Sequence, residues 1–122
     1  MDVIRELHRV ISITSILFFA LLGIWGVLRA FRGKGVEASY LGALVIGEIV
    51  FLLQGVLGLI LIISGARPGG TIHLLYGAVA LLALPALFAF TKGDDSHQAQ
   101  WYYAILTLLL TGIAFRAIAT SV

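Results

Sequence analysis

The sequence predicts an all-α protein, a four-helix transmembrane bundle. Its 122 residues are 61% hydrophobic and only 11% charged, whereas soluble domains average about 25% charged residues. Four apolar runs each approach the ~20 residues that a helix needs to cross the hydrocarbon core of a bilayer. They leave no room for a soluble unit, so we expect one domain over residues 1–122. The expected helices cover about residues 4–31, 40–64, 71–91 and 100–119.

The first expected helix carries His8 near its start. Small and hydroxyl side chains follow His8 at helical spacing, including Ser12 and Ser15, and they share its face. The run ends in Arg29 and Arg32, not in a small-residue cleavage site. We therefore expect a membrane helix and not a cleaved signal peptide.

The second expected helix contains one carboxylate, Glu48, and one amide, Gln54, within its apolar run. Gly47 and Gly58 fall near the face of Gln54, which favours close packing against another helix. Ionisable groups inside a membrane segment are costly and usually functional. Glu48 is therefore a candidate functional residue in its own right.

The third expected helix begins at Thr71, whose hydroxyl suits an N-cap, and it places His73 in its first turn. Tyr76 and Gly77 lie on the His73 side. Pro85 should bend the second half of this helix, because it cannot donate a backbone hydrogen bond.

The fourth expected helix follows a polar segment, residues 92–100, in which we expect His97 to be a solvated loop residue. Trp101, Tyr102 and Tyr103 are typical of the aromatic belt at a membrane interface. Arg116 lies near the exit of the helix and can extend to the membrane surface.

Because consecutive spans alternate in direction, His8 and His73 should lie at similar depth on one side of the membrane. Two imidazoles facing each other across a bundle are the axial ligands of a bis-histidine heme, whose porphyrin needs apolar walls and whose propionates pair with arginines. We therefore predict His8 and His73 as iron ligands. The other predicted heme-binding residues are Arg9, Arg67, Arg116, Gln54 and Gly77. The sequence has no Cys-x-x-Cys-His motif, which predicts noncovalent heme b.

Other interpretations of the two histidines stay open. Each one alone would most simply be a half-hydrated residue at the membrane interface. A zinc or copper site is weaker, because only Glu6 offers a third ligand nearby. The sequence has no cysteine, which excludes disulfides, thiol redox chemistry and iron–sulfur clusters. A net charge of only +2, scattered in loops, gives no support for nucleic-acid binding.

The basic residues do not by themselves orient the chain. Four are expected on the histidine side: Arg5, Arg9, Arg67 and Arg116. Four are expected on the other side: Arg29, Arg32, Lys34 and Lys92. If the first group neutralises heme propionates, the second group marks the cytoplasmic side. We then expect a prokaryotic-type plasma membrane, with both termini and the heme on the extracytoplasmic side.

Three segments resemble the heme A synthase family. Glu6-Leu7-His8-Arg9-Val10 is similar to its helix-opening His-Arg motif, Gln54-Gly55-Val56-Leu57-Gly58 to the glycine-rich stretch of its next helix, and Ile72-His73-Leu74-Leu75 to the start of the helix after that. The resemblance covers about residues 6–84 and implies one half of that family's duplicated four-helix bundle, in permuted order. It also implies that His8 and His73 are heme ligands on the extracytoplasmic side.

The chain departs from the family at one chemically important position. The family's catalytic half has a glutamate three residues before the first histidine, and here that residue is Arg5. The family's paired cysteines are also absent. We therefore do not expect heme A synthase activity, and we expect electron transfer or heme handling.

Two other functions remain open from the sequence. A small proton-coupled transporter would use Glu48, because a carboxyl in an apolar environment can bind and release a proton. An accessory subunit would only pack against a larger membrane complex. Expected partners are membrane lipid, a quinone or a redox protein, and either further copies of the chain or a larger complex.

Overall fold

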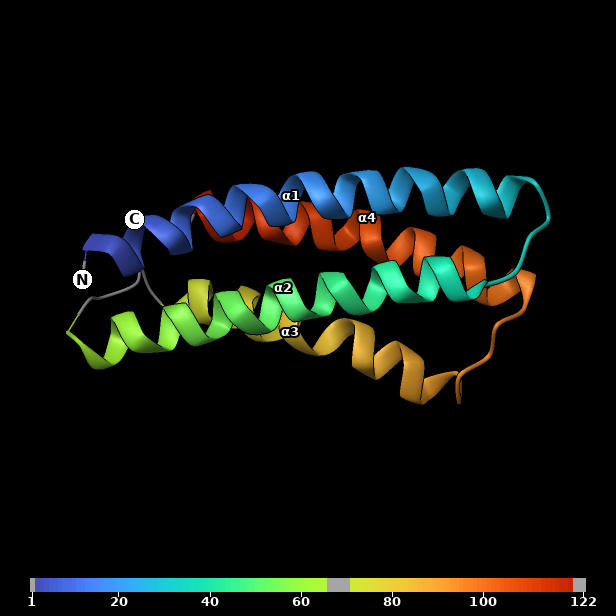
Figure 1. Cartoon of the computed structure of the whole chain (residues 1–122). Coiled ribbons are helices and arrows are strands. Elements are labelled where there is room, and N and C mark those ends of the chain that lie inside the picture. Colours follow the sequence, from blue (N-terminus) through green and yellow to red (C-terminus); the bar gives the residue numbers. More distant parts are fainter. Residues whose placement is uncertain (1, 66–70, 120–122) are drawn as a thin grey trace.

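The computed structural model describes residues 2–65 and 71–119. Over these residues the chain forms four helices and no strand: α1 (Asp2–Phe31), α2 (Ala38–Ile63), α3 (Thr71–Phe90) and α4 (His97–Ala119) (Figure 1). Each is long and apolar enough to cross a membrane. The all-α, four-helix prediction is confirmed, and the chain has the features of an integral membrane protein.

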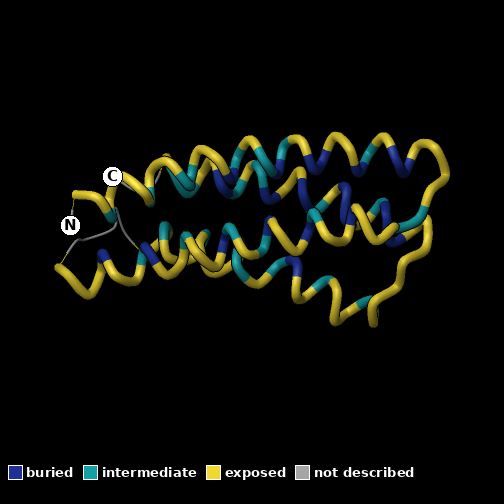
Figure 2. The backbone as a smooth tube through the Cα atoms, in the orientation of Figure 1, coloured by how far each residue is buried: buried dark blue, intermediate teal, exposed yellow. Residues whose placement is uncertain are grey.

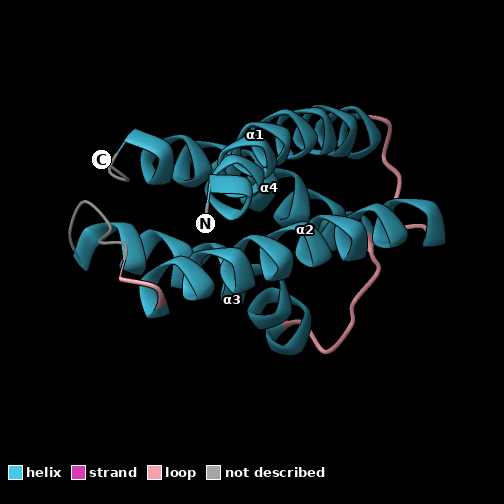
Figure 3. Ribbon diagram, turned by 60° about the vertical axis from the view of Figure 1, so that its left-hand side comes forward, coloured by secondary structure: helices cyan, strands magenta, loops and turns pink. Residues whose placement is uncertain are grey.

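The helices run alternately up and down and form two layers, α1 with α4 and α2 with α3 (Figure 3). Each helix packs on two neighbours: α1 lies against α4 and α2, and α3 lies against the same two helices. Within the described residues α1 and α3 therefore stand diagonally opposite. The α1–α4 contact is the most extensive, and the α2–α3 contact is the least.

Glycines explain the close approach of α1 to its neighbours. A Cβ added at Gly47 of α2 would lie 2.6 Å from the ring of Phe19, and one added at Gly23 of α1 would lie 2.5 Å from Leu108 of α4. Phe19 in turn stacks on Phe51 with 4.4 Å between ring centroids. Small residues thus let the backbones approach, which is how helices associate in lipid without a hydrophobic driving force.

Many large apolar residues are exposed, as expected for contact with lipid, and Figure 2 shows exposed positions along all four helices. Only Ala80 and Leu84 are buried on α3, so this helix packs most thinly. Among the described residues, ten form the hydrophobic core: Phe19, Leu22, Tyr40, Leu44, Phe51, Ala80, Leu84, Ala99, Tyr103 and Leu110.

The end of the bundle that carries the α1–α2 and α3–α4 loops is held together by a buried arginine. Arg29 is only 8% exposed, and its Nη2 donates to the Gly35 carbonyl oxygen at 2.6 Å. Its Nε donates to Oε1 of Gln100 at 3.3 Å. Glu37 lies 3.3 Å from the same guanidinium. One charge thus joins α1, α4 and the first loop.

The expectation that His97 is a solvated loop residue is wrong in one respect. His97 is exposed but is the first residue of α4, and its Nε2 lies 2.7 Å from the Ala30 carbonyl oxygen at the end of α1. The helix begins here because Ser96 caps it: the Ser96 hydroxyl accepts a hydrogen bond from the Ala99 amide at 3.2 Å. α4 therefore begins three residues earlier than expected.

Candidate functional site

The two histidines singled out from the sequence face each other across the diagonal of the bundle. The ring centroids of His8 on α1 and His73 on α3 are 6.5 Å apart, and the ring planes are inclined by 73°. Both side chains are half-buried. They lie near the end of the bundle that holds both termini (Figure 1).

The tautomer of His73 follows from its hydrogen bond. Nδ1 of His73 lies 2.8 Å from the carbonyl oxygen of Ala117. Ala117 is in the last turn of α4, where carbonyl oxygens have no donor within the helix. A carbonyl can only accept, so Nδ1 carries the proton and the lone pair of His73 is on Nε2. A hydrogen bond from one ring nitrogen is the usual way in which a protein orients a histidine whose other ring nitrogen binds a metal.

His8 is held through its backbone. Nε2 of Gln54, on α2, donates to the His8 carbonyl oxygen at 2.8 Å. Two atoms in the same neighbourhood are buried without a hydrogen-bond partner within the described residues: Nδ1 of His8 and Oε1 of Gln54. An unsatisfied buried polar atom is costly. A bound group that coordinates or hydrogen-bonds these atoms would remove that cost.

Glycines leave room at the histidines. A Cβ at Gly58 of α2 would lie 3.3 Å from Cε1 of His8, so any larger residue would press on the ring. A Cβ at Gly77, one turn after His73, would meet nothing within 4 Å. Gly58 therefore sets the position of a ring, whereas Gly77 lines open space.

The predicted propionate-binding arginines have different surroundings. Arg9 is paired with Glu6: its Nε donates to Glu6 Oε2 at 3.1 Å, and both side chains are exposed. Arg116 is in the last turn of α4, at the same end of the bundle. Arg67 lies outside the described residues.

The spacing of the histidines suits one iron atom between them. A metal–nitrogen bond is about 2.0 Å, and a ring nitrogen lies about 1.1 Å from its ring centroid. Two imidazoles on opposite sides of one metal therefore have centroids roughly 6 Å apart, close to the observed 6.5 Å. Within the described residues no three His, Cys, Asp or Glu side chains gather as a metal site.

Glu48 does not join the histidines. It lies on the same helix as Gln54, six residues earlier, which is about 9 Å along the axis. Its side chain is half-buried and its Oε1 has no partner within the described residues. It lines a separate groove toward the other end of the bundle.

Several contacts were not predicted from the sequence. The Ala117 carbonyl that orients His73 has no side-chain signal, although the end of a helix always offers free carbonyls. The pairing of Glu6 with Arg9 has a signal, since residues three apart share a helix face. The burial of Arg29 and Gln100 was not predicted from the sequence.

No protein-family model, curated protein or solved structure matches the chain. The resemblance to one half of the heme A synthase bundle therefore stays a prediction. The candidate site rests on the residues of this chain: His8 and His73, with Gln54, Gly58 and the Ala117 carbonyl around them.

Proposed function

We propose that the chain is an integral membrane protein that binds noncovalent heme b between α1 and α3, with His8 and His73 as the axial ligands. The observation that carries the proposal is the pair of imidazoles facing each other across the bundle diagonal, with 6.5 Å between their centroids. Bound heme would supply one-electron redox chemistry. The proposed role is electron transfer or heme handling.

The neighbouring groups have distinct roles in this proposal. The Ala117 carbonyl keeps the proton of His73 on Nδ1 and so leaves Nε2 for a metal. The Gln54 amide holds the helical turn of His8. Gly58 allows the Cε1 edge of the His8 ring to approach α2 closely. The lack of any side chain at Gly77 leaves space for a planar ligand beside His73.

The basic groups at this end would neutralise the heme propionates. Arg116 and Arg67 are proposed to do so, together with Arg9 once it exchanges its partner Glu6. We place the protein in a prokaryotic-type plasma membrane with this end on the extracytoplasmic side. A quinone or a redox protein would be the electron partner, within a homo-oligomer or a larger complex. Heme A synthesis is not proposed, because Arg5 stands where that chemistry has a glutamate.

The proposal is tested by absorption spectroscopy of the detergent-purified chain after heme supply. The reduced-minus-oxidised spectrum is expected to show the sharp α band of low-spin b-type heme. His8→Ala and His73→Ala should each abolish the six-coordinate spectrum. His97→Ala is the matched control, because His97 lies at the opposite end of the bundle, and it should leave the spectrum unchanged. A preparation that takes up no heme would refute the proposal.

A second candidate function is proton-coupled transport centred on Glu48. The observation that favours it is the buried carboxyl oxygen without a partner in the described residues. Glu48→Gln distinguishes the two functions, because glutamine cannot release a proton. The substitution should leave the heme spectrum intact if the first proposal is right. It should abolish proton-driven uptake into liposomes if the second is right.

A further inference from the structure

A groove about 300 Å³ in volume separates α2 from α3 and α4 in the half of the bundle away from the histidines. Its walls are almost entirely apolar, and only two lining residues, Glu48 and Tyr103, have polar side-chain atoms. The lining residues are Leu41, Leu44, Val45, Glu48, Leu84, Pro85, Phe88 and Tyr103. The volume is at the lower end of the range for small-molecule sites, about 300–1,000 Å³.

The groove exists because α3 turns away from α2. Pro85 lies inside α3 and lines the groove, and a proline there removes one helical hydrogen bond and bends the helix. Figure 1 shows the second half of α3 diverging from α2. As a result Glu48 receives no hydrogen bond from α3, and its Oε1 is buried without a partner within the described residues.

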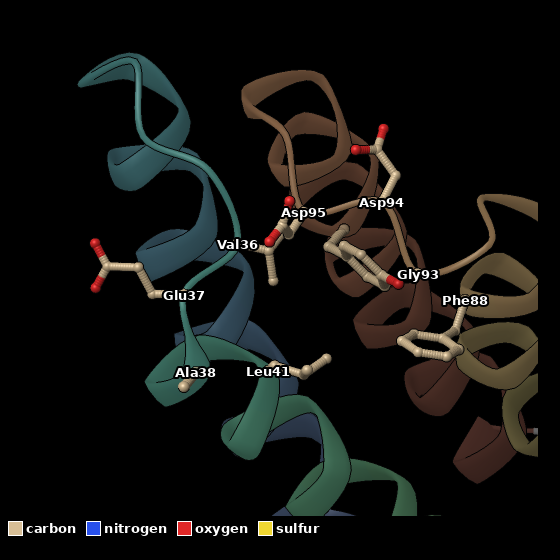
Figure 4. A pocket seen from close by; sticks show the side chains of 9 residues that line it. Val36, Glu37, Ala38, Leu41, Phe88, Gly93, Asp94 and Asp95 are labelled. Carbon is tan, nitrogen blue, oxygen red and sulfur yellow. The ribbon is translucent and has the colours of Figure 1, made fainter.

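The groove continues to the loop end of the bundle. A second pocket of about 320 Å³ shares three lining residues with it: Leu41, Phe88 and Tyr103. In Figure 4 the side chains of Leu41 and Phe88 point toward one another across this pocket. The two pockets therefore adjoin at these residues, and we call them together the passage; its outer part lies at the loop end of the bundle and its inner part at Glu48.

The charge along this passage has one sign. Asp94, Asp95 and Glu37 line its outer part and Glu48 its inner part, and no lysine or arginine is among the lining residues. Figure 4 shows the Glu37 carboxylate turned away from the pocket, where it pairs with Arg29. Asp94 and Asp95 therefore place negative charge among the lining residues of the mouth, although Lys34 and Lys92 lie in the same two loops, and a carboxylate attracts cations.

We propose that this passage binds a lipophilic organic cation, an alkyl- or arylammonium ion, with its nitrogen at Glu48. The cation supplies the charge that the unpartnered carboxylate lacks. Its apolar body lies against Leu44, Val45 and Leu84. The rings of Phe88 and Tyr103 flank the route, and aromatic faces stabilise quaternary ammonium groups. The proposal does not depend on heme, because within the described part of the chain none of these residues contacts His8 or His73.

The shape and charge distinguish this ligand from other occupants. An acyl chain or a neutral quinol would fit the apolar walls but would gain nothing from Asp94 and Asp95. A second copy of the chain would have to place a hydrogen-bond donor or a basic side chain at Glu48 to satisfy it. A small cation with an apolar body satisfies both the walls and the carboxylates.

The test is calorimetric titration of the full chain in nanodiscs, with empty nanodiscs as the partition control. The probe is benzyltrimethylammonium, and its matched control is neopentylbenzene, which has the same shape without the charge. Saturable binding is expected for the ammonium ion only. Glu48→Gln should weaken it by about 30-fold or more, as expected for loss of one partner of a desolvated charge pair. Asp2→Asn removes one charge at the far end and should have no effect.

Asp95→Asn should weaken binding only about two- to threefold and reduce its dependence on salt, because a charge at the mouth acts through a screened field. Modification of Glu48 by a hydrophobic carbodiimide, followed by mass spectrometry, gives an independent measurement. The ammonium ion should protect Glu48 from this reagent.

Three results would overturn the proposal. Equal binding of the neutral probe would show that the groove is a site for acyl chains. Glu48-dependent binding of a quinol analogue in place of the ammonium ion would make a quinol the occupant. Protection of Glu48 that rises with protein density in the nanodisc, without added cation, would show that a second copy covers the groove.

Discussion

Enlarging Gly58 should displace His8 and weaken heme binding in proportion to the size of the added side chain. A Cβ at Gly58 would lie 3.3 Å from Cε1 of His8, closer than an ordinary carbon–carbon contact of 3.5–4.0 Å. Gly58→Ala therefore requires the ring to shift by a few tenths of an ångström. Gly58→Leu requires the ring to leave its position. Gly55→Ala and Gly55→Leu are the matched controls on the same helix, because a Cβ there meets nothing within 4 Å.

The magnitude follows from the contact. Changes that misplace a ligand by altering its support cost about 10–100-fold in metal affinity. Gly58→Ala should reduce the affinity for heme by about 10-fold or less, and Gly58→Leu should reduce it by about 100-fold or more. These factors correspond to roughly 1.4 and 2.7 kcal/mol of binding free energy. Both alanine variants also gain about 0.5–1 kcal/mol of helix stability, so the difference between the positions isolates the contact with His8.

The assay is titration of the heme-free chain with hemin, followed by absorption spectroscopy of the bound form. Gly58→Ala should keep a low-spin spectrum with reduced affinity. Gly58→Leu should show a high-spin, five-coordinate spectrum held by His73 alone. The two Gly55 variants should match the unmodified chain. Equal affinity and equal spectra for Gly58→Leu and Gly55→Leu would refute the placement of His8 as a ligand.

Two further predictions concern the other end of the bundle and its orientation. Arg29→Met should lower the free energy of unfolding by about 3 kcal/mol, because charged hydrogen bonds contribute about 1.5–3 kcal/mol each and Arg29 donates to Gly35 and Gln100. Thermal unfolding in detergent measures this change. The control is Arg32→Met at an exposed position, which should change the free energy of unfolding by less than about 0.5 kcal/mol. A reporter that is active only in the cytoplasm should be silent when fused to the C-terminus and active in the 92–96 loop, and the reverse pattern would show the opposite orientation.

The pairing of the two histidines could be predicted because it depends only on periodicity and topology. An apolar run of about 20 residues specifies a span, and alternating spans place the starts of the first and third helices at one end. His8 and His73 therefore had to lie at similar depth. Their facing across the diagonal depended on which helices pack together. The packing of the helices depends in part on the glycines of α1 and α2, which let neighbouring helices approach closely. No single sequence motif reveals this packing.

The hydrogen bonds around the histidines were less accessible from the sequence. The partner of His73 is the backbone of Ala117, and a carbonyl carries no residue-specific signal. Gln54 was expected to contact a cofactor; in the structure it lies beside His8 and donates to the backbone carbonyl of that residue. Which atom of a buried amide meets which neighbour depends on packing details that side-chain type does not encode.

The loop end shows where interfacial residues were misinterpreted. From the sequence we expect residues 94–96 to be part of a polar segment, although an aspartate and a serine before an apolar run are a helix-start signal. Asp94 accepts a hydrogen bond from the Ser96 hydroxyl at 2.9 Å, and Ser96 caps α4. The sequence predicts Arg29 only as one of the basic residues on the side of the bundle away from the histidines. It is buried because Gln100 and Gly35 satisfy its donors locally.

Coordination of one heme by both His8 and His73 is tested most directly by electron paramagnetic resonance of the ferric protein. The angle between the axial imidazole planes controls the splitting of the iron d orbitals, and the observed angle is 73°. Nearly perpendicular planes predict a highly anisotropic low-spin signal with a large maximum g value. This signal should vanish in His8→Ala and in His73→Ala. A high-spin signal from the unmodified chain, or a low-spin signal that survives either substitution, would contradict the bis-histidine site.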